Sequence, residues 1–149
     1  MITPTLGRPS LVLDELIILD GATGSQASTW VPPREKYIDF GDANQAMFSF
    51  EVYGGGPGIG SVTLYAQRTA SSGSDDEDFE NMNATGVTLA ATHAWHELSF
   101  GRDPTTAGDK PPQGLGRPYL KNGHATNFAV VRLRVWVELQ RYPQRRGVM

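Results

Sequence analysis

Residues 128–140 alternate between an apolar and a mixed set of side chains, in the longest regular pattern of the chain. The apolar set comprises Ala129, Val131, Leu133, Val135, Val137 and Leu139. Successive side chains of a β-strand point to opposite faces, so the pattern predicts a strand with one face in the core. The other face carries Arg132, Arg134 and Trp136, which are costly to leave in open water. We therefore expect these three side chains to be covered by another sheet, another subunit or a protein shell.

Several shorter segments carry strand patterns of their own. Residues 46–53 and 61–69 alternate well and flank the glycine-rich stretch 54–60, which predicts an antiparallel hairpin. Residues 11–19 are apolar on both parities, as in a strand that is buried on both faces or meets a partner, with a short helix as the competing interpretation. Further short strands are predicted at residues 29–31 and 37–40, at 87–91 and 94–100 as a pair, and at 117–120. Only residues 74–82 offer a helical turn.

About eight short strands with turns between them predict an all-β fold, an antiparallel β-sandwich or barrel, with a jelly roll as the best fit. The 17 glycines and 10 prolines among 149 residues agree with many turns and few helices. Pro4, Gly7 and Pro9 break regular structure and predict an irregular N-terminal arm. The predicted organisation is an arm at residues 1–10, a single β-sandwich domain at 11–141 and a C-terminal tail at 142–149.

Composition argues against several functions. The net charge of −3 at pH 7 gives no basis for nucleic-acid binding. Cysteine is absent, which excludes disulfides, thiol nucleophiles and thiolate metal sites. No run of about 18 apolar residues occurs, so we predict no membrane-spanning helix and no membrane partner. Residues 1–10 lack the apolar core of a signal peptide, and we do not expect export by the ordinary secretory route.

No catalytic or metal-binding motif is recognisable. The stretch GGGPGIG at residues 54–60 precedes a predicted strand and lacks GK[ST], which indicates a turn rather than a phosphate-binding loop. His93 and His96 would point to opposite faces of a strand and could not share a metal ion. The acidic stretch 75–80 lacks the ligand spacing of an EF-hand, which favours a solvated loop over a calcium site. No G-x-S-x-G motif frames a serine, and no carboxylate pair stands out for glycoside hydrolysis. We predict no catalytic residues, no metal and no cofactor.

Four segments follow one another in a distinctive order. They are the N-terminal arm before LVLDELIILD, the segment STWVPPREKYIDFGD, the stretch AMFSFEVYGGGPGIGSVTLYAQRTAS and the closing RPYLKNGHATNFAVVRLRVWVEL. An early strand leads through a small-residue loop to an extended piece that ends in the turn Asp39-Phe40-Gly41. In this order and spacing, over most of its length, the chain resembles the decoration, or cement, proteins of tailed-bacteriophage capsids.

The resemblance implies a jelly-roll or related β-sandwich that forms homotrimers at threefold positions on the outside of an icosahedral head. Such proteins bind after the shell expands and clamp neighbouring subunits of the major capsid protein. It therefore implies a non-enzymatic virion protein that is made in the host cytoplasm and located on the capsid exterior. Three contacts per trimer would turn modest single-site affinity into strong avidity. The candidate interface residues are Leu6, Arg8, Leu11, Leu13, Trp30, Arg132, Arg134 and Trp136.

Two other functions remain open from the sequence. A carbohydrate-binding β-sandwich, such as a virion or tail adhesin, could use Trp30, Trp95 and Trp136 as a platform on which sugar rings stack. Another head or tail structural subunit would have the same sequence features as a decoration protein.

Overall fold

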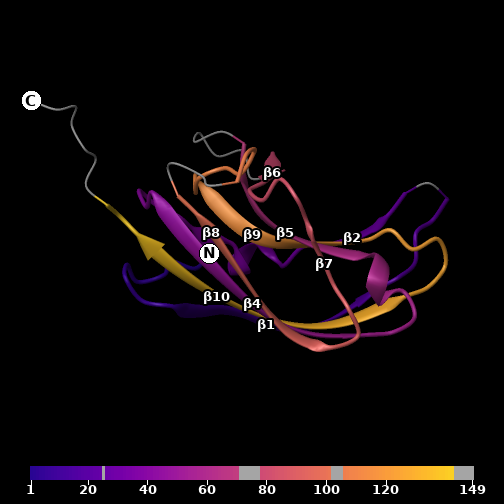
Figure 1. Ribbon diagram of the computed structural model, residues 1–149. Coiled ribbons are helices and arrows are strands. Elements are labelled where there is room, and N and C mark those ends of the chain that lie inside the picture. Colours follow the sequence, from indigo (N-terminus) through magenta and orange to yellow (C-terminus); the bar gives the residue numbers. More distant parts are fainter. Residues whose placement is uncertain (25, 71–77, 102–105, 143–149) are drawn as a thin grey trace, which may run out of the picture.

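The computed structural model describes residues 1–24, 26–70, 78–101 and 106–142. Within them the chain forms two antiparallel β-sheets that pack face to face (Figure 1). Sheet I has the strand order β1 (Ser10–Leu19), β10 (Ala129–Gln140), β4 (Gln45–Gly55), β8 (His93–Phe100). Sheet II has the order β2 (Ser28–Trp30), β9 (Leu115–Asn122), β5 (Val62–Thr69), β6 (Phe79–Asn81). The smaller elements are β3 (Ile38–Asp39) beside β9, β7 (Val87–Thr88) beside β5, and the short 3-10 helices η1 (Arg34–Lys36) and η2 (Ile59–Ser61).

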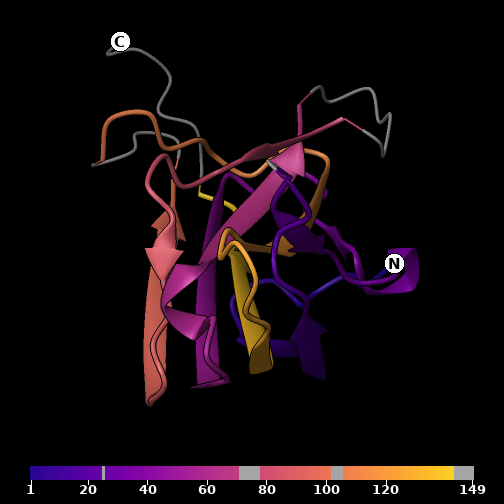
Figure 2. The same cartoon turned by 90° about the vertical axis from the view of Figure 1, so that its right-hand side faces the viewer.

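The strands pair in a nested order along the chain. β1 pairs with β10, β2 and β3 with β9, β4 with β8, and β5 with β6 and β7. This is the order of a jelly roll, in which a long folded-over ribbon of strands wraps into two sheets. Figure 2 shows the four strands of sheet I side by side, with sheet II crossing above them. The prediction of an all-β antiparallel sandwich is confirmed.

The core lies between the sheets and follows the predicted alternation. In β10 the apolar parity from Ala129 to Leu139 is at most 2% exposed, which confirms its inward face. Across the core, Val62, Leu64 and Ala66 of β5 are fully buried. Phenylalanine rings fill the space between, with centroid distances from Phe48 of 6.1 Å to Phe40, 5.7 Å to Phe50 and 6.0 Å to Phe100.

A β-bulge explains why the apolar residues 11–13 do not alternate, whereas Leu16 and Ile18 break the pattern as exposed apolar side chains. The pairing of β1 with β10 shifts its register between Leu11 and Leu13, so that Val12 and Leu13 are both buried. After the bulge, Ile17 and Leu19 point inward while their neighbours point outward. The expectation that Leu13 lies at an interface was wrong, because the extra residue of the bulge turns its side chain into the core.

The predicted hairpin between residues 46–53 and 61–69 was wrong. These segments form β4 and β5, which lie in different sheets, and the chain crosses from one sheet to the other through η2. In both strands every second side chain is buried. This pattern is expected for two strands of a hairpin, and it is equally expected for two strands that face each other across a core. The predicted pair 87–91 and 94–100 is likewise divided, with β7 in sheet II and β8 in sheet I.

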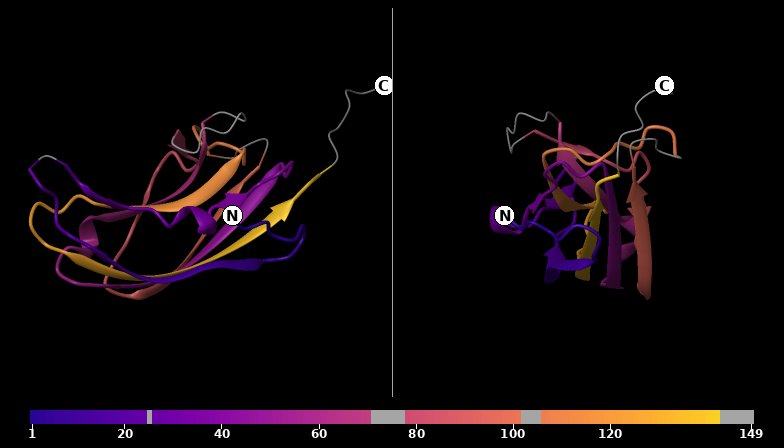
Figure 3. Two further views of the ribbon diagram at one scale, coloured as in Figure 1. Left: turned by 180° about the vertical axis from the view of Figure 1, so that it is seen from behind. Right: turned by 90° about the vertical axis from the view of Figure 1, so that its left-hand side faces the viewer.

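The N-terminal arm is irregular, as predicted, but it docks on its own domain. The N–H of Ile2 donates to the Tyr37 carbonyl at 2.7 Å, and the Ile2 carbonyl accepts from the N–H of Asp39 at 2.7 Å. Further along, the N–H of Gly7 donates to the Leu139 carbonyl at 2.8 Å. The N-terminus consequently lies beside η1 and β3 rather than projecting away from the sandwich (Figure 3).

The predicted helical turn at residues 74–82 was wrong where the structure describes it. Residues Phe79–Asn81 form β6, because their backbone pairs with β5. The remainder of that stretch, up to residue 77, lies outside the described residues.

Two neighbouring glycines test the crossing between the sheets. A Cβ at Gly54 would collide with the carbonyl oxygen of Ala90 and the side chain of Ile59, whereas a Cβ at Gly55 would meet nothing within 4 Å. Neither glycine has a positive φ, so only the packing differs. We expect Gly54→Ala to lower the free energy of unfolding by about 1–3 kcal/mol in urea denaturation. The control, Gly55→Ala, should change it by less than about 0.5 kcal/mol. Equal losses in the two variants would contradict the close approach at Gly54.

Candidate functional site

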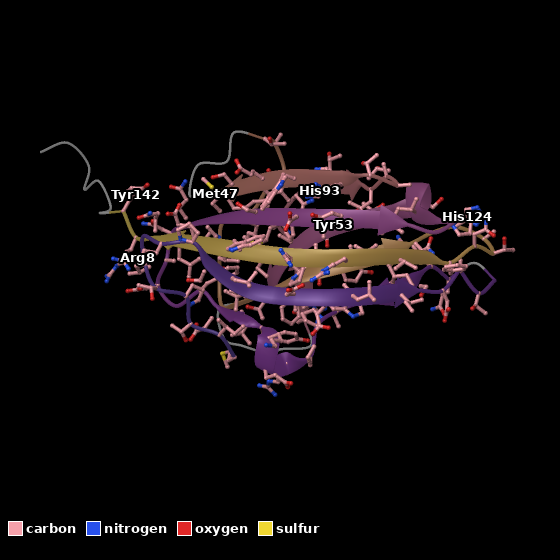
Figure 4. The ribbon with its side chains drawn as sticks, turned by 90° about the horizontal axis from the view of Figure 1, so that it is seen from below. Arg8, Met47, Tyr53, His93, His124 and Tyr142 are labelled. Carbon is pink, nitrogen blue, oxygen red and sulfur yellow. The ribbon has the colours of Figure 1, made fainter. Side chains whose placement is uncertain are left out.

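The outer face of sheet I brings charged, aromatic and apolar side chains onto one surface (Figure 4). The register arranges them in rows across β1, β10, β4 and β8, where opposite residues are about 5 Å apart. The rows are Ile18, Val130, Gly55; Leu16, Arg132, Tyr53, His93; Asp14, Arg134, Glu51, Trp95; and Leu11, Trp136, Ser49, Glu97. We call the surface made by these four rows the open face.

A chain of opposite charges crosses the middle of the open face. The Glu51 side chain is only 9% exposed, and its Oε2 lies 2.9 Å from Nε2 of His93. Its Oε1 lies 3.4 Å from Nη1 of Arg134, whose Nε is 3.3 Å from Oδ2 of Asp14. Arg132 approaches the same Asp14 carboxylate at 3.6 Å. Hydrogen bonds and ion pairs thus link side chains of all four strands, and the guanidinium of Arg134 offsets part of the hydration that the Glu51 carboxylate has lost.

The ion pairs of Arg134 are loose. Its Nε is buried and has no hydrogen bond of acceptable geometry within the described residues, although the Asp14 carboxylate is close. We therefore regard the contact between Arg134 and Asp14 as a Coulombic attraction rather than a directed hydrogen bond. The guanidinium therefore keeps part of its hydrogen-bonding capacity.

Four aromatic rings surround this charged centre. Tyr53 stacks on His93 with the ring centroids 4.1 Å apart and the planes 5° from parallel. Trp95 lies 5.3 Å from Trp136 and 6.4 Å from His93, measured between centroids. Tyr53 is 45% exposed and Trp95 is 54% exposed. Exposed Tyr and Trp beside Arg are the composition of the energetic centre of protein–protein interfaces.

The edge strand β1 adds an apolar stripe to the open face. Leu16 is 67% exposed, Ile18 is 68% exposed and Leu11 is 52% exposed, all on the outward side. Phe128, just before β10, is 47% exposed. Single exposed apolar residues are common, but Leu16 and Ile18 are neighbours on the outward side of β1, with Asp14 between them and Leu11, and such a group next to aromatic rings marks an interaction surface.

The structure brings together four of the predicted interface residues and separates the others. Leu11, Arg132, Arg134 and Trp136 lie on the open face. Leu6 and Arg8 are exposed, and Arg8 lies at the end of sheet I where β10 finishes (Figure 4). Trp30 lies in sheet II and packs half-buried against the core, away from the other tryptophans.

Within the described residues, no strand, helix or loop covers the predicted second face of β10. Neighbouring side chains of sheet I shield it in part, and the Arg132 side chain remains 50% exposed. The expectation that a second sheet covers this face is therefore wrong for the described chain, whereas cover by another subunit or a shell stays a prediction.

Three residues of the open face escaped the sequence analysis. Glu51 and Tyr53 occupy the more polar of the two alternating sets in residues 46–53, but nothing in the local pattern indicated that they adjoin Arg134. His93 was weighed only as a metal ligand, and its place beside Glu51 follows from the pairing of β4 with β8. The missing signal was the register between three strands that are far apart in the sequence.

A second feature lies on the opposite side of the molecule, on the outer face of sheet II. It is a shallow groove of about 240 Å³ lined by Tyr65, Gln67, Phe79, Asn81, Tyr119 and Lys121, with Glu80 at its border. Glu80 is held by two cations: its carboxylate accepts from Nζ of Lys110 at 2.7 Å and from Nε of Arg68 at 2.9 Å. The hydrogen bond from Lys110, together with Arg68, lowers the pKa of Glu80 below its ordinary value.

Metal-binding clusters and membrane-spanning helices were both looked for in the part of the chain that the structure describes. No group of three or more His, Asp or Glu side chains could hold a metal ion there, and no helix in it is long and apolar enough to cross a membrane. His93 and His96 do point to opposite faces of β8, since they pair with the exposed Tyr53 and the buried Phe50. Residues 75–77 of the predicted acidic loop lie outside the described residues, whereas Glu80 belongs to β6 and is paired with Arg68 and Lys110.

No protein-family profile matches the sequence, and no curated protein is significantly similar to it. The function of the protein is therefore inferred from the open face and the groove.

The charged centre of the open face can be tested through Glu51. We expect Glu51→Gln to lower the free energy of unfolding by about 1–3 kcal/mol, because Arg134 and His93 lose a nearly buried anion. Glu97→Gln is the matched control, since Glu97 is an exposed carboxylate on the same face without an ion pair in the described chain. It should change stability by less than about 0.5 kcal/mol in the same urea measurement. A neutral Glu51→Gln would show that the charge chain contributes nothing to folding.

The ion pairs of Glu80 with Lys110 and Arg68 predict that the stability of the protein depends on pH. A carboxyl whose pKa is lower in the folded than in the unfolded state stabilises the protein above the unfolded value, and this contribution disappears as the pH falls through the folded value. We therefore expect wild type to be more stable than Glu80→Gln at pH 6, with a difference that shrinks as the pH falls below about 4.5, the ordinary value for glutamate. Thermal unfolding of both proteins between pH 6 and pH 3 measures this. A constant difference would exclude the assigned origin of the shift.

Proposed function

We propose that the protein is a non-enzymatic structural protein that binds another protein through the open face. In the setting that the family resemblance implies, it decorates the outer surface of a tailed-phage capsid as a homotrimer and stabilises contacts between major capsid protein subunits. The observation that carries the proposal is the uncovered face of sheet I, on which exposed Trp95 and Tyr53 surround Arg134 and the nearly buried Glu51. The partner itself is taken from the resemblance.

The energetic layout of the open face supports protein binding. Interfaces gain most of their affinity from a few aromatic and arginine side chains that a partner desolvates, enclosed by contacts that exclude water. Here Trp95 and Tyr53 are about half exposed and Trp136 lies beside Trp95, so a partner that covers these rings removes water from a large aromatic surface. The apolar stripe of β1 would border such a contact on one side.

The scaffold supports the same conclusion. Every side chain of the open face belongs to a strand of sheet I, and the strands are fixed by long antiparallel pairings. A surface on rigid strands loses little conformational entropy when it binds. Because the arm docks on its own domain, we place the partner contact on the open face rather than on an extended arm, with Leu6 and Arg8 at its border.

A second candidate function is carbohydrate binding at the same face. Trp95 is exposed beside Trp136, and two such rings offer a stacking surface for sugars. Trp30 cannot belong to this platform because it lies in sheet II. Binding in a glycan array that Trp95→Ala abolishes, with unchanged oligomeric state, would favour this function over protein binding. If the protein is another head or tail subunit, it would bind through the same face. The position of the protein in an imaged particle would distinguish this role from decoration.

The proposed assembly can be measured by light scattering of the purified protein, alone and with expanded capsids. We expect a mass three times that of the 16.2 kDa chain and co-migration with capsids. Arg132→Glu and Trp95→Ala should each weaken assembly or capsid binding at least tenfold, with a melting temperature that falls by only a few degrees, because both side chains are about half exposed and the pair of Arg132 with Asp14 lies at the surface.

Lys36→Glu is the control for this experiment. It makes the same change of charge as Arg132→Glu but lies exposed in η1, away from sheet I. It should assemble and bind as wild type does. A protein that is monomeric and does not bind capsids would contradict the decoration hypothesis. Open-face variants that still assemble would show that the interface lies elsewhere on the molecule.

A further inference from the structure

The groove on sheet II is built from aligned polar and aromatic side chains. Tyr65 of β5 lies directly opposite Tyr119 of β9, and their ring centroids are 6.1 Å apart. On one side of this pair Lys121 emerges from β9, and on the other side Gln67 faces Asn81 of β6. No aliphatic side chain lines the groove. A peptide would therefore find no pocket for an apolar side chain here, whereas a ligand rich in hydroxyl groups would find polar partners.

Several polar groups in the groove have no partner within the described chain. The hydroxyls of Tyr65 and Tyr119, the ammonium of Lys121 and the Nδ2 of Asn81 take part in no hydrogen bond or ion pair there. Burial raises the pKa of Tyr119, so its phenol stays protonated and can donate a hydrogen bond. Together these groups offer donors around a pair of aromatic rings.

Other side chains hold the groove in one arrangement. Gln67 is 7% exposed, and its Nε2 donates to Oδ1 of Asn81 at 3.0 Å, so the free amide nitrogen of Asn81 is left for a ligand. The Oε1 of Gln67 accepts from Nε of Arg117 at 2.9 Å, and Arg117 in turn donates to the Tyr37 hydroxyl at 2.8 Å. The guanidinium lies 3.8 Å above the Phe79 ring. The amide of Asn81 is therefore oriented before any ligand binds.

Four cations, Arg68, Lys110, Arg117 and Lys121, lie in the groove or contact its lining residues, although the whole chain carries −3. Lys110 and Arg68 both contact the one carboxylate at its border, Glu80. Arg117 and Lys121 have no carboxylate partner among the described residues, and the charge of Arg117 acts on Tyr119. A ligand with a carboxylate would satisfy this excess of positive charge.

We propose that this groove binds a saccharide that carries a carboxylate, such as a uronic or sialic acid residue. The sugar ring packs against Tyr65 and Tyr119, Asn81 and the tyrosine hydroxyls bond its hydroxyl groups, and Lys121 pairs with its carboxylate. The volume of about 240 Å³ suits one sugar residue rather than a larger ligand. The site lies on the face of the sandwich opposite the open face, so the protein can bind a partner and a glycan at once.

The test is an NMR titration of the intact ¹⁵N-labelled protein with three probes: a uronic-acid trisaccharide, a sialylated trisaccharide and a neutral trisaccharide. We expect one of the carboxylated probes to bind with shift changes at Tyr65, Asn81, Tyr119 and Lys121, and none at Trp95. The neutral probe should bind at least tenfold more weakly. Affinity should fall with added salt, because the pair with Lys121 is exposed.

Variants identify the groups responsible. Lys121→Ala and Tyr119→Ala should each weaken binding about tenfold, through the lost charge and the lost ring. Lys36→Ala is the control for charge and should leave the affinity within twofold. If Tyr119→Ala fails to fold, Tyr119→Phe keeps the ring, removes the hydroxyl and should still weaken binding about threefold.

Three results would overturn the proposal. They are the absence of binding by both carboxylated probes at millimolar concentration, shift changes confined to Trp95 and Trp136, and equal binding of an acidic hexapeptide. The second would assign sugar binding to the open face, and the third would assign the groove to an acidic protein segment. Open-face variants such as Arg132→Glu should leave glycan affinity unchanged, so failure of the assembly hypothesis and failure of this one are distinguishable.

Discussion

The fold depends on the pairing of β10 with β1 on one side and β4 on the other, over almost the whole length of the strand. This central strand supplies the apolar floor of the core with one parity and the arginines and a tryptophan of the open face with the other. Because its side chains alternate, neither role can shift without the other: a slip of one residue would bury Arg132 and Arg134 and expose Leu133 and Val135. The packing of the inward side chains of β10 thereby fixes the positions of its outward side chains.

The two outer faces of the sandwich differ in physical character. The open face on sheet I has aromatic rings and apolar side chains around a balanced set of opposite charges, which suits a large partner that excludes water. The groove on sheet II has polar donors and unbalanced positive charge, which suits a small hydrated ligand. The nested strand order places them back to back, with the core between them.

Local patterns predicted the strands well and their partners poorly. The alternation of residues 128–140 sufficed to identify the inward parity of β10, because period and burial are local properties of a strand. The glycine-rich stretch at 54–60 led to a wrong hairpin, since the choice between pairing within a sheet and crossing between sheets depends on strands far along the chain. The bulge at Leu13 and the cluster of Glu51, His93 and Arg134 depend on register in the same way. Register is decided by long-range pairing, which a single sequence does not reveal.

The position of β10 along the sequence has a consequence for synthesis. This strand follows every other strand of the sandwich, yet it lies between β1 and β4 in sheet I. A nascent chain that lacks it can bring neither the two halves of sheet I together nor Arg134 to Glu51. The open face therefore forms only after β10 has been synthesised, whereas the strands that line the groove on sheet II all precede β10 in the chain. The strand order thereby ties the formation of the open face to the synthesis of the last strand of the sandwich.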